Sequence, residues 1–208
     1  LGVAGRLRGS ALVAGLVAVI AIDLWSIDRG FYTFSPRAEQ LFANDAVTTH
    51  LQAVTPPYRV LDAANAYSHS ILMKYRIPNV LGYHGFELQN YRTLGGQAEG
   101  WRNLGAPNIF SLLAVRFLIL DRADTIPGFH QVVGPTATPF GTTAVLYEQD
   151  TVPPYARVIL SAAKVPDAQV VPTLIDARFP VNSVLLLPDT STAQVPQAFD
   201  FQAVARDA

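Results

Sequence analysis

The apolar run from Ala11 to Ile22 constrains this chain more than any other feature. Its twelve residues span only about 18 Å as a helix, which is short of a hydrocarbon core of roughly 30 Å. Counting from Leu7 to Trp25 gives roughly 28 Å, which is enough if Arg8 extends its side chain towards the headgroups. We therefore predict a transmembrane helix over residues 1–25.

Two arginines, Arg6 and Arg8, precede this run, so the positive-inside rule predicts a cytoplasmic start and an extracytoplasmic remainder. A signal peptide is the rival interpretation, because the small-residue ending Val19-Ile20-Ala21 also suits cleavage. Both interpretations export the rest of the chain, and membrane lipid is a partner in the first. A buried helix of a soluble protein is the weakest interpretation, because the run has no polar stripe. The chain begins at Leu1, which suggests a processed chain or a piece of a longer one.

Composition removes several classes of protein. Half of the 208 residues are apolar, which is enough for a substantial core. Fifteen basic and sixteen acidic residues nearly balance, and no basic run follows the first ten positions, so we expect no nucleic-acid partner. The chain has no cysteine, which excludes disulfides and thiolate metal sites.

Beyond the apolar run, the pattern predicts an α+β fold. Residues 26–57 are predicted to form a juxtamembrane connector followed by a helix, and residues 58–208 a mixed α/β extracytoplasmic domain. This domain could continue beyond the C-terminal end of the sequence. Strands at Tyr58–Leu61 and Phe117–Leu120 should be buried neighbours, with the 82–91 segment near their ends.

A predicted helix begins at Asn44 or Asp45, because either residue suits an N-cap, and runs to Val54, and a predicted helix over 86–94 ends at the glycine pair Gly95-Gly96. The remaining elements are helices at 108–113 and 167–177, strands at 130–133, 143–147, 157–160 and 183–187, and an apolar segment at 71–77 that fits either helix or strand.

The candidate binding residues cluster around two glycines. Gly82 and Gly85 bracket Tyr83-His84, and Glu87 follows His84 at a helical spacing of three. A structural histidine in a glycine turn is the commoner meaning of such a pattern, and His84 has no sequence-local partners that would complete a metal site. Aromatic and polar residues nearby form a mixture that suits a sugar or a lipid headgroup, although such aromatics are more often core. That mixture comprises Tyr83, Phe86, Tyr91 and Trp101 with His84, Glu87, Gln89 and Arg92.

Asp62 is a further candidate because it ends a predicted strand, where α/β folds often place functional carboxylates. A loop-capping role is commoner for such an aspartate. The sequence has no nucleophile elbow, phosphate-binding loop, dinucleotide fingerprint or zinc-protease motif. We predict binding roles for Asp62, Tyr83, His84, Glu87, Tyr91 and Arg92, name no catalytic residue, and predict no metal site and no cofactor within this chain.

Several stretches, taken in order, resemble the bacterial YfhO-like membrane proteins. They are Tyr58-Arg-Val-Leu-Asp62, Gly82-Tyr-His-Gly-Phe-Glu-Leu-Gln-Asn-Tyr91, Asn108 to Leu120, Val145-Leu-Tyr-Glu148, Pro154-Tyr-Ala-Arg-Val158 and the hydrophobic strand near Leu185. The Gly-Tyr-His-Gly element, with a tyrosine six residues after its second glycine, is the most specific part.

This resemblance implies a polytopic glycosyltransferase of the GT-C type, which uses a polyprenyl-phosphate sugar to modify a cell-envelope polymer outside the membrane. It also leaves a divalent cation open for the whole enzyme. The multi-span membrane part and the early loop carboxylates expected to act as the base are not in this sequence. Glycosyl transfer needs a carboxylate for the acceptor hydroxyl and cations for phosphate charge, and Asp62, Glu87, Arg59 and Arg92 have that chemistry. The alternatives are a noncatalytic module that binds an envelope polymer or partner, and a secreted enzyme.

Overall fold

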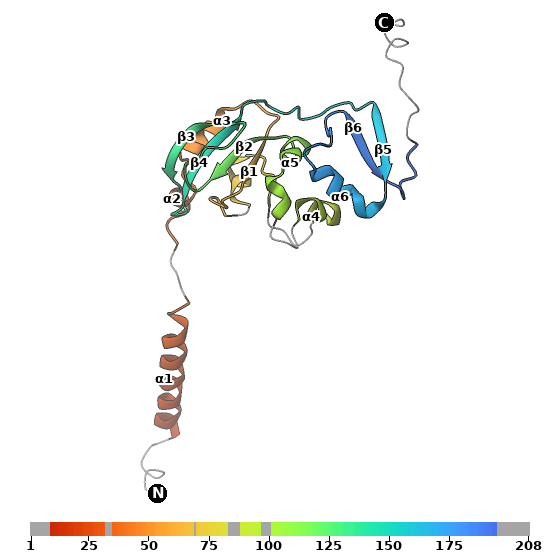
Figure 1. Ribbon diagram of the computed structural model, residues 1–208. Coiled ribbons are helices and arrows are strands. Elements are labelled where there is room, and N and C mark those ends of the chain that lie inside the picture. The colour runs from red at the N-terminus through yellow and green to blue at the C-terminus, as the bar shows by residue number, and fades with distance from the viewer. Residues whose placement is uncertain (1–8, 32–34, 69, 83–87, 97–100, 195–208) are drawn as a thin grey trace, which may run out of the picture. The chain divides into compact units, whose positions relative to one another are not determined.

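The computed structural model describes residues 9–31, 35–68, 70–82, 88–96 and 101–194 (Figure 1). The chain divides into two compact units, Leu1–Phe42 and Ala43–Ala208. The first contains helix α1 (Gly9–Asp28) and the short helix α2 (Ala38–Leu41). The second contains every strand that the structure describes.

Helix α1 has the length and composition of a membrane span. It is 20 residues long, its mean hydropathy reaches 2.1 over 18 residues, and none of its residues is buried. The predicted apolar helix is therefore confirmed, and it extends to Asp28. A signal sequence near the N-terminus would have the same properties.

Helix α3 (Ala46–Ala53) begins the globular unit where the sequence predicts a helix. Asp45 caps it: the Thr48 backbone N–H donates to the Asp45 carboxylate at 2.7 Å, and the Asp45 N–H donates to the Thr48 hydroxyl at 2.9 Å. This reciprocal pair satisfies backbone donors that have no partner within the helix. The predicted role of an Asn or Asp cap is borne out at Asp45.

A four-stranded mixed sheet forms the centre of this unit. Strands β1 and β2 are parallel and adjacent, with Val60 opposite Phe117 and Leu61 opposite Leu118, so the predicted neighbouring buried strands are confirmed. Strand β4 pairs antiparallel with both β2 and β3, which gives the order β1-β2-β4-β3. The strands are β1 (Arg59–Asp62), β2 (Val115–Leu120), β3 (Phe129–Ala137) and β4 (Thr143–Gln149).

The connection from β1 to β2 supplies most of the helical cover. Asn79 in this connection forms an isolated parallel bridge with Val60, which holds the connection against the free edge of β1. The helices described in it are the 3-10 helix η1 (Ile71–Tyr75), α4 (Gln89–Gly95), the 3-10 helix η3 (Arg102–Gly105) and α5 (Pro107–Leu112). Gly96, in the left-handed region, ends α4 at the predicted glycine pair.

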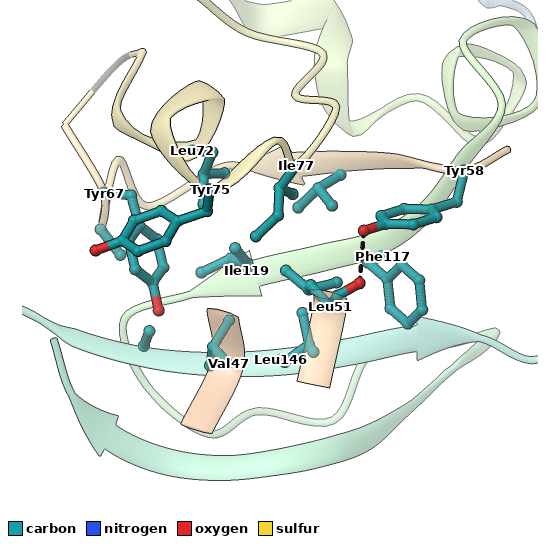
Figure 2. Packing of buried hydrophobic residues seen from close by; sticks show 13 residues of the cluster. Val47, Leu51, Tyr58, Tyr67, Leu72, Tyr75, Ile77, Phe117, Ile119 and Leu146 are labelled. Carbon is teal, nitrogen blue, oxygen red and sulfur yellow. Dashed lines mark hydrogen bonds between the residues drawn. The ribbon is translucent and has the colours of Figure 1, made fainter. Parts of the chain in front are cut away.

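Buried side chains form one cluster on each face of the sheet. Alternate residues of β2 divide between them: Phe117 and Ile119 pack with α3 and η1, whereas Leu118 packs with α5 and η3. In the first cluster the Tyr58 hydroxyl also donates to the Leu51 carbonyl at 2.6 Å, which ties α3 to the sheet (Figure 2). The sheet is therefore the middle of three layers.

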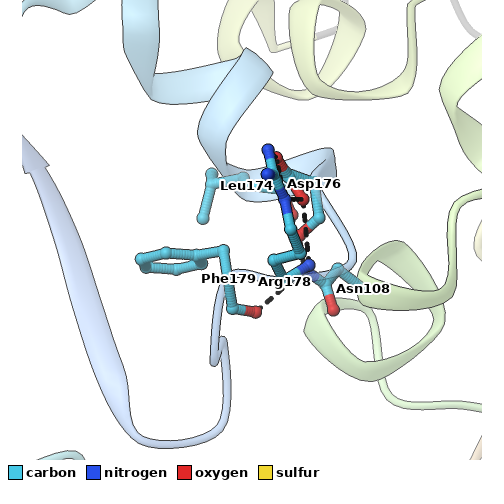
Figure 3. Close-up of polar contacts among 5 residues, drawn as sticks. All are labelled: Asn108, Leu174, Asp176, Arg178 and Phe179. Carbon is cyan, nitrogen blue, oxygen red and sulfur yellow. Dashed lines mark hydrogen bonds and ion pairs between the residues drawn. The ribbon is translucent and has the colours of Figure 1, made fainter.

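A second, two-stranded parallel sheet follows, made of β5 (Ser161–Val165) and β6 (Val184–Pro188) with helix α6 (Asp167–Ile175) between them in sequence. The Asn108 side-chain amide lies within hydrogen-bond distance, 2.7 to 3.1 Å, of the carbonyls of Leu174, Asp176 and Phe179, in the last turn of α6 and the loop that follows it (Figure 3). The helix predicted at 167–177 and the strand at 183–187 are found, and Pro172 lies inside α6.

The strand predicted at 157–160 is wrong, because pairing begins only at Ser161. Arg157 donates to the Ser111 hydroxyl at 3.1 Å and the Ser111 carbonyl at 3.2 Å, and it also bonds the Asn182 side chain. These contacts hold Arg157 against Ser111, in the last turn of α5, and no strand forms at 157–160.

Candidate functional site

A cavity of about 350 Å³ lies at the amino-terminal end of β1. This volume falls at the lower end of the range for small-molecule sites. Its wall combines a cation, aromatic rings and amide groups with aliphatic side chains. The described residues that line it are Arg59, Asn79, Val80, Leu81, Gly82, Leu88, Tyr91 and Trp101.

Arg59, the first residue of β1, supplies the charge of this cavity. Its guanidinium donates to the Leu113 carbonyl at 3.1 Å, and its central carbon lies 5.0 Å from the centre of the Tyr155 ring. A guanidinium over an aromatic face is attracted by the ring electrons. Two contacts from different parts of the chain therefore hold the cation in one position before any ligand arrives.

Tyr91 enters from α4. Its hydroxyl donates to the Val80 carbonyl at 2.6 Å, so its proton is already engaged. Burial raises the pKa of Tyr91, and the positive charge of Arg59 partly offsets that rise. Tyr91 therefore stays neutral at physiological pH, and its oxygen lone pairs can accept a hydrogen bond from a ligand.

Trp101 adopts a backbone conformation that few non-glycine residues adopt. Its φ is 61°, and its N–H donates to the Gly96 carbonyl at 3.0 Å. Its ring packs directly on Gly95, where an added Cβ would lie 2.6 Å from the Trp101 ring. Left-handed backbone costs about 1–2 kcal/mol for such a residue, so the surrounding contacts must hold it there.

Aliphatic and amide groups complete the wall. The Asn79 side-chain oxygen accepts from the Leu81 N–H at 3.3 Å, within the segment that bridges to Val60. Leu88, at the start of α4, is 78% exposed although it lines the cavity. The site is thus partly open to solvent on the side of Leu88.

Among the predicted site residues, Tyr91 lines the cavity and Asp62 does not. Asp62 ends β1, whereas Arg59 begins it, so the two lie at opposite ends of the same strand. Asp62 is only 4% exposed and accepts from the Ala66 and Tyr67 N–H groups, both at 2.9 Å. These contacts are those of a loop-capping aspartate.

The pKa of Asp62 reflects this position. Burial raises the pKa, and the backbone N–H groups of the loop oppose that rise. Because the described residues place no arginine or lysine in an ion pair with Asp62, the loop amides alone compensate its charge. The carboxylate is suited to holding the loop.

The other predicted site residues are divided between described and undescribed parts of the chain. Tyr83, His84 and Glu87 lie outside the described residues, so their predicted roles stay predictions. Arg92 lies on α4, one residue after Tyr91, and is exposed. Two more cavity residues were noted in the sequence: Trp101 in the mixture of aromatic and polar residues, and Arg59 as a cation suited to phosphate charge. Asn79 had no feature in the sequence that marked it as a site residue.

Ion pairs between described residues also lie outside the cavity. Arg116 on β2 and Glu148 on β4 approach to 2.7 Å and are both mostly shielded from solvent, which joins the two strands. His130 and Asp150 form an exposed pair at 2.8 Å. Asp176 pairs with Arg178, which lowers the pKa of Asp176 to about 2. Within the described part of the chain, no three acidic or histidine side chains come together in a way that would hold a metal ion.

The chemistry of the described lining residues suits the binding of a small polar ligand. The described lining residues offer a fixed cation, a hydroxyl oxygen and an indole ring, and none of them is a carboxylate, serine or histidine. Comparison with protein-family models, with curated proteins and with solved structures finds no match.

Proposed function

We propose that this chain is the extracytoplasmic part of a polytopic membrane glycosyltransferase, which uses a polyprenyl-phosphate-linked sugar to modify a cell-envelope polymer. In this proposal α1 is a membrane span, and the globular unit binds a sugar in the cavity lined by Arg59, Tyr91 and Trp101. The observation that carries the proposal is this cavity, because it combines an aromatic ring with polar groups in a small volume.

The cavity chemistry suits a sugar for two reasons. A pyranose has hydroxyl groups around its edge, which the Arg59 donors and the Tyr91 oxygen can pair with. It also has C–H groups on its ring faces, which pack well against an indole such as Trp101. Fixed polar groups beside aromatic and aliphatic side chains are typical of sites that select one orientation of a small ligand.

The chemical step in this proposal belongs to other residues. Deprotonating an acceptor hydroxyl requires a base, and the described lining residues contain no carboxylate. Glu87 keeps its predicted binding role, outside the described residues. The globular unit then selects or positions a sugar-bearing substrate, while a carboxylate elsewhere in the whole enzyme performs the transfer.

Tryptophan fluorescence tests the sugar site directly. The chain has two tryptophans, Trp25 and Trp101, so a Trp25→Phe variant reports only on Trp101. We expect monosaccharides, titrated into this variant in detergent micelles, to change the emission of Trp101 saturably. A Tyr91→Phe substitution in the same background should weaken binding by roughly tenfold, because it removes the hydroxyl oxygen. No saturable change with any sugar tested would refute the proposed site.

A cellular experiment tests the glycosyltransferase part. With Trp101→Ala in the chromosomal gene, we expect the sugar content of the envelope polymer to fall and the lipid-linked sugar to accumulate. Val158→Ala is the matched control, because Val158 is 85% exposed and lies outside the cavity lining. An unchanged polymer and unchanged lipid-linked sugar would count against this part.

The absence of a carboxylate among the described lining residues also favours a second candidate, a noncatalytic module that binds an envelope polymer or a neighbouring membrane protein. That candidate predicts that Trp101→Ala weakens ligand binding, while transfer proceeds at the normal rate once the acceptor is saturating. Measuring transfer in membranes against acceptor concentration separates the two candidates.

A further inference from the structure

We infer that the cavity selects a sugar that carries an oxyanion, either a phosphoryl or a carboxylate group, and that the Arg59 guanidinium binds this group. The inference rests on the proposed function, since it names the class of sugar that the same cavity takes.

The first argument is charge balance. Arg59 is the only charged side chain among the described residues that line the cavity. Arg116 pairs with Glu148, His130 with Asp150, and Arg178 with Asp176, and none of these pairs among the described residues involves Arg59. A partly buried cation that has no carboxylate beside it among the described lining residues makes the site attractive to an anion.

The second argument is the fixed orientation of this cation. The Leu113 carbonyl takes one N–H donor of Arg59, and the Tyr155 ring covers one face of the guanidinium. The other N–H donors remain, and their planar arrangement matches two oxygens of a carboxylate or phosphoryl group. Because the side chain is already held in place, binding an anion loses little of its conformational entropy.

The third argument concerns the rest of the ligand. Tyr91 accepts and Trp101 presents a ring, and neither feature serves a bare inorganic anion. Arg59 also lies close enough to Tyr91 to lower the pKa that burial raises, so the anion and the sugar hydroxyls would meet in one small site. A charged monosaccharide unit uses all three residues at once.

Four probes test this inference in the full chain carrying Trp25→Phe: glucose, glucose 1-phosphate, glucuronate and inorganic phosphate. We expect both charged sugars to bind at least about tenfold more tightly than glucose, the scale of one charge-assisted hydrogen bond. Raising NaCl from about 50 to about 300 mM should reduce this preference and leave glucose binding nearly unchanged. Tighter binding of glucose 1-phosphate indicates a sugar phosphate, as in a lipid-linked donor, and tighter binding of glucuronate indicates an acidic sugar of a polymer.

Variants assign the preference to one residue. Arg59→Gln should bring the charged sugars to the affinity of glucose, and Arg59→Lys should retain part of the preference because it keeps the charge but loses the planar fork. Arg122→Gln is the matched control, since Arg122 is exposed and outside the cavity lining. Urea unfolding of each variant identifies any loss of the fold. The comparison of the four probes in the protein that retains Arg59 does not depend on how the Arg59 variants fold.

Each other result overturns a defined part. Equal binding of glucose and charged sugars overturns the inference and leaves the sugar site intact. Phosphate binding as tightly as glucose 1-phosphate overturns the sugar component, and with it the proposed site. No binding of any sugar, charged or neutral, overturns both.

Discussion

At the scale of single residues, the Asp62 carboxylate fixes the loop that follows β1. Replacing it by asparagine leaves one oxygen for a backbone N–H and places an amide donor opposite the other. We expect Asp62→Asn to lower the free energy of unfolding by about 1–3 kcal/mol, as measured by urea denaturation. Asp121→Asn is the control, because Asp121 follows the neighbouring strand β2 and is exposed. Equal effects of the two substitutions would contradict the loop-capping role.

Gly95 is important because it has no side chain. An alanine there improves helix propensity by about 1 kcal/mol, but its Cβ would meet the Trp101 ring at 2.6 Å. Because ring and backbone must shift, we expect Gly95→Ala to destabilise the unit by about 1–3 kcal/mol and to change Trp101 emission in the Trp25→Phe background. Gly105→Ala, where an added Cβ meets nothing within 4 Å, should change neither.

At the scale of elements, Asp45 connects helix α3 to the loop that follows β1. Besides capping α3, its second carboxylate oxygen accepts from the Tyr67 hydroxyl at 2.7 Å. Asp45→Ala removes the cap and leaves the buried tyrosine hydroxyl without this acceptor, so we expect a loss of about 2 kcal/mol in urea denaturation. Thr49→Ala, at an exposed position of the same helix, should cost far less. Similar losses for both would show that helix propensity, rather than the cap, matters here.

The elements that the sequence predicted well have strong local signals. Residues 117–120 form a compact apolar run, and α3 has both a capping residue and a regular apolar spacing. The segment at 71–77 left helix and strand open, and it contains a 3-10 helix whose end at Arg76 adopts a left-handed conformation. Residues 157–160 misled because the contacts that hold Arg157 come from Ser111 and Asn182, which lie far away in sequence.

The candidate site was partly predictable for the same reason. Tyr91 and Trp101 stand out as aromatics among polar residues, and Arg59 as a cation beside a strand. Their meeting in one cavity depends on the β1–β2 connection returning to the edge of β1 through the Asn79–Val60 bridge, which no local pattern encodes. Asp62 was predicted as a site residue because it ends a strand. The cavity, however, lies at the other end of that strand.

At the scale of the whole molecule, buried tyrosines make stability depend on pH. Burial raises the pKa of Tyr58, Tyr67, Tyr75 and Tyr91 above the ordinary value of 10.0. Below about pH 10 both folded and unfolded chains keep these protons, so the full contribution is present. As pH rises above 10, the unfolded chain releases protons that the folded chain retains, and stability falls.

Urea denaturation near pH 8 and near pH 11 checks this expectation, because only the second condition lies above the ordinary tyrosine pKa. The largest rise belongs to Tyr67, whose hydroxyl also bonds the Asp45 carboxylate. Tyr67→Phe should therefore lose less stability than the wild type between the two conditions. An identical loss in both proteins would assign the alkaline sensitivity to other groups.

The apolar helix lies in one unit and the globular domain in the other, which leads to a prediction about membrane attachment. We expect the full chain to remain in membranes after alkaline carbonate extraction, and the 43–208 segment to fold without them. Because the chain has no cysteine, a single Val158→Cys substitution provides a unique label site at an exposed position. An impermeant maleimide should label it in cells whose outer face is accessible. Labelling only after the membrane is opened would reverse the proposed orientation.

The position of the cavity affects how its ligand preference can change during evolution. Except for Arg59, every described lining residue comes from the single connection between β1 and β2, whereas α3, β3 and β4 contribute none. Substitutions or length changes in that one connection can therefore alter which compound is chosen while the strand pairing persists. Related chains would diversify by revising this connection, and grafting it between two of them should transfer the ligand preference.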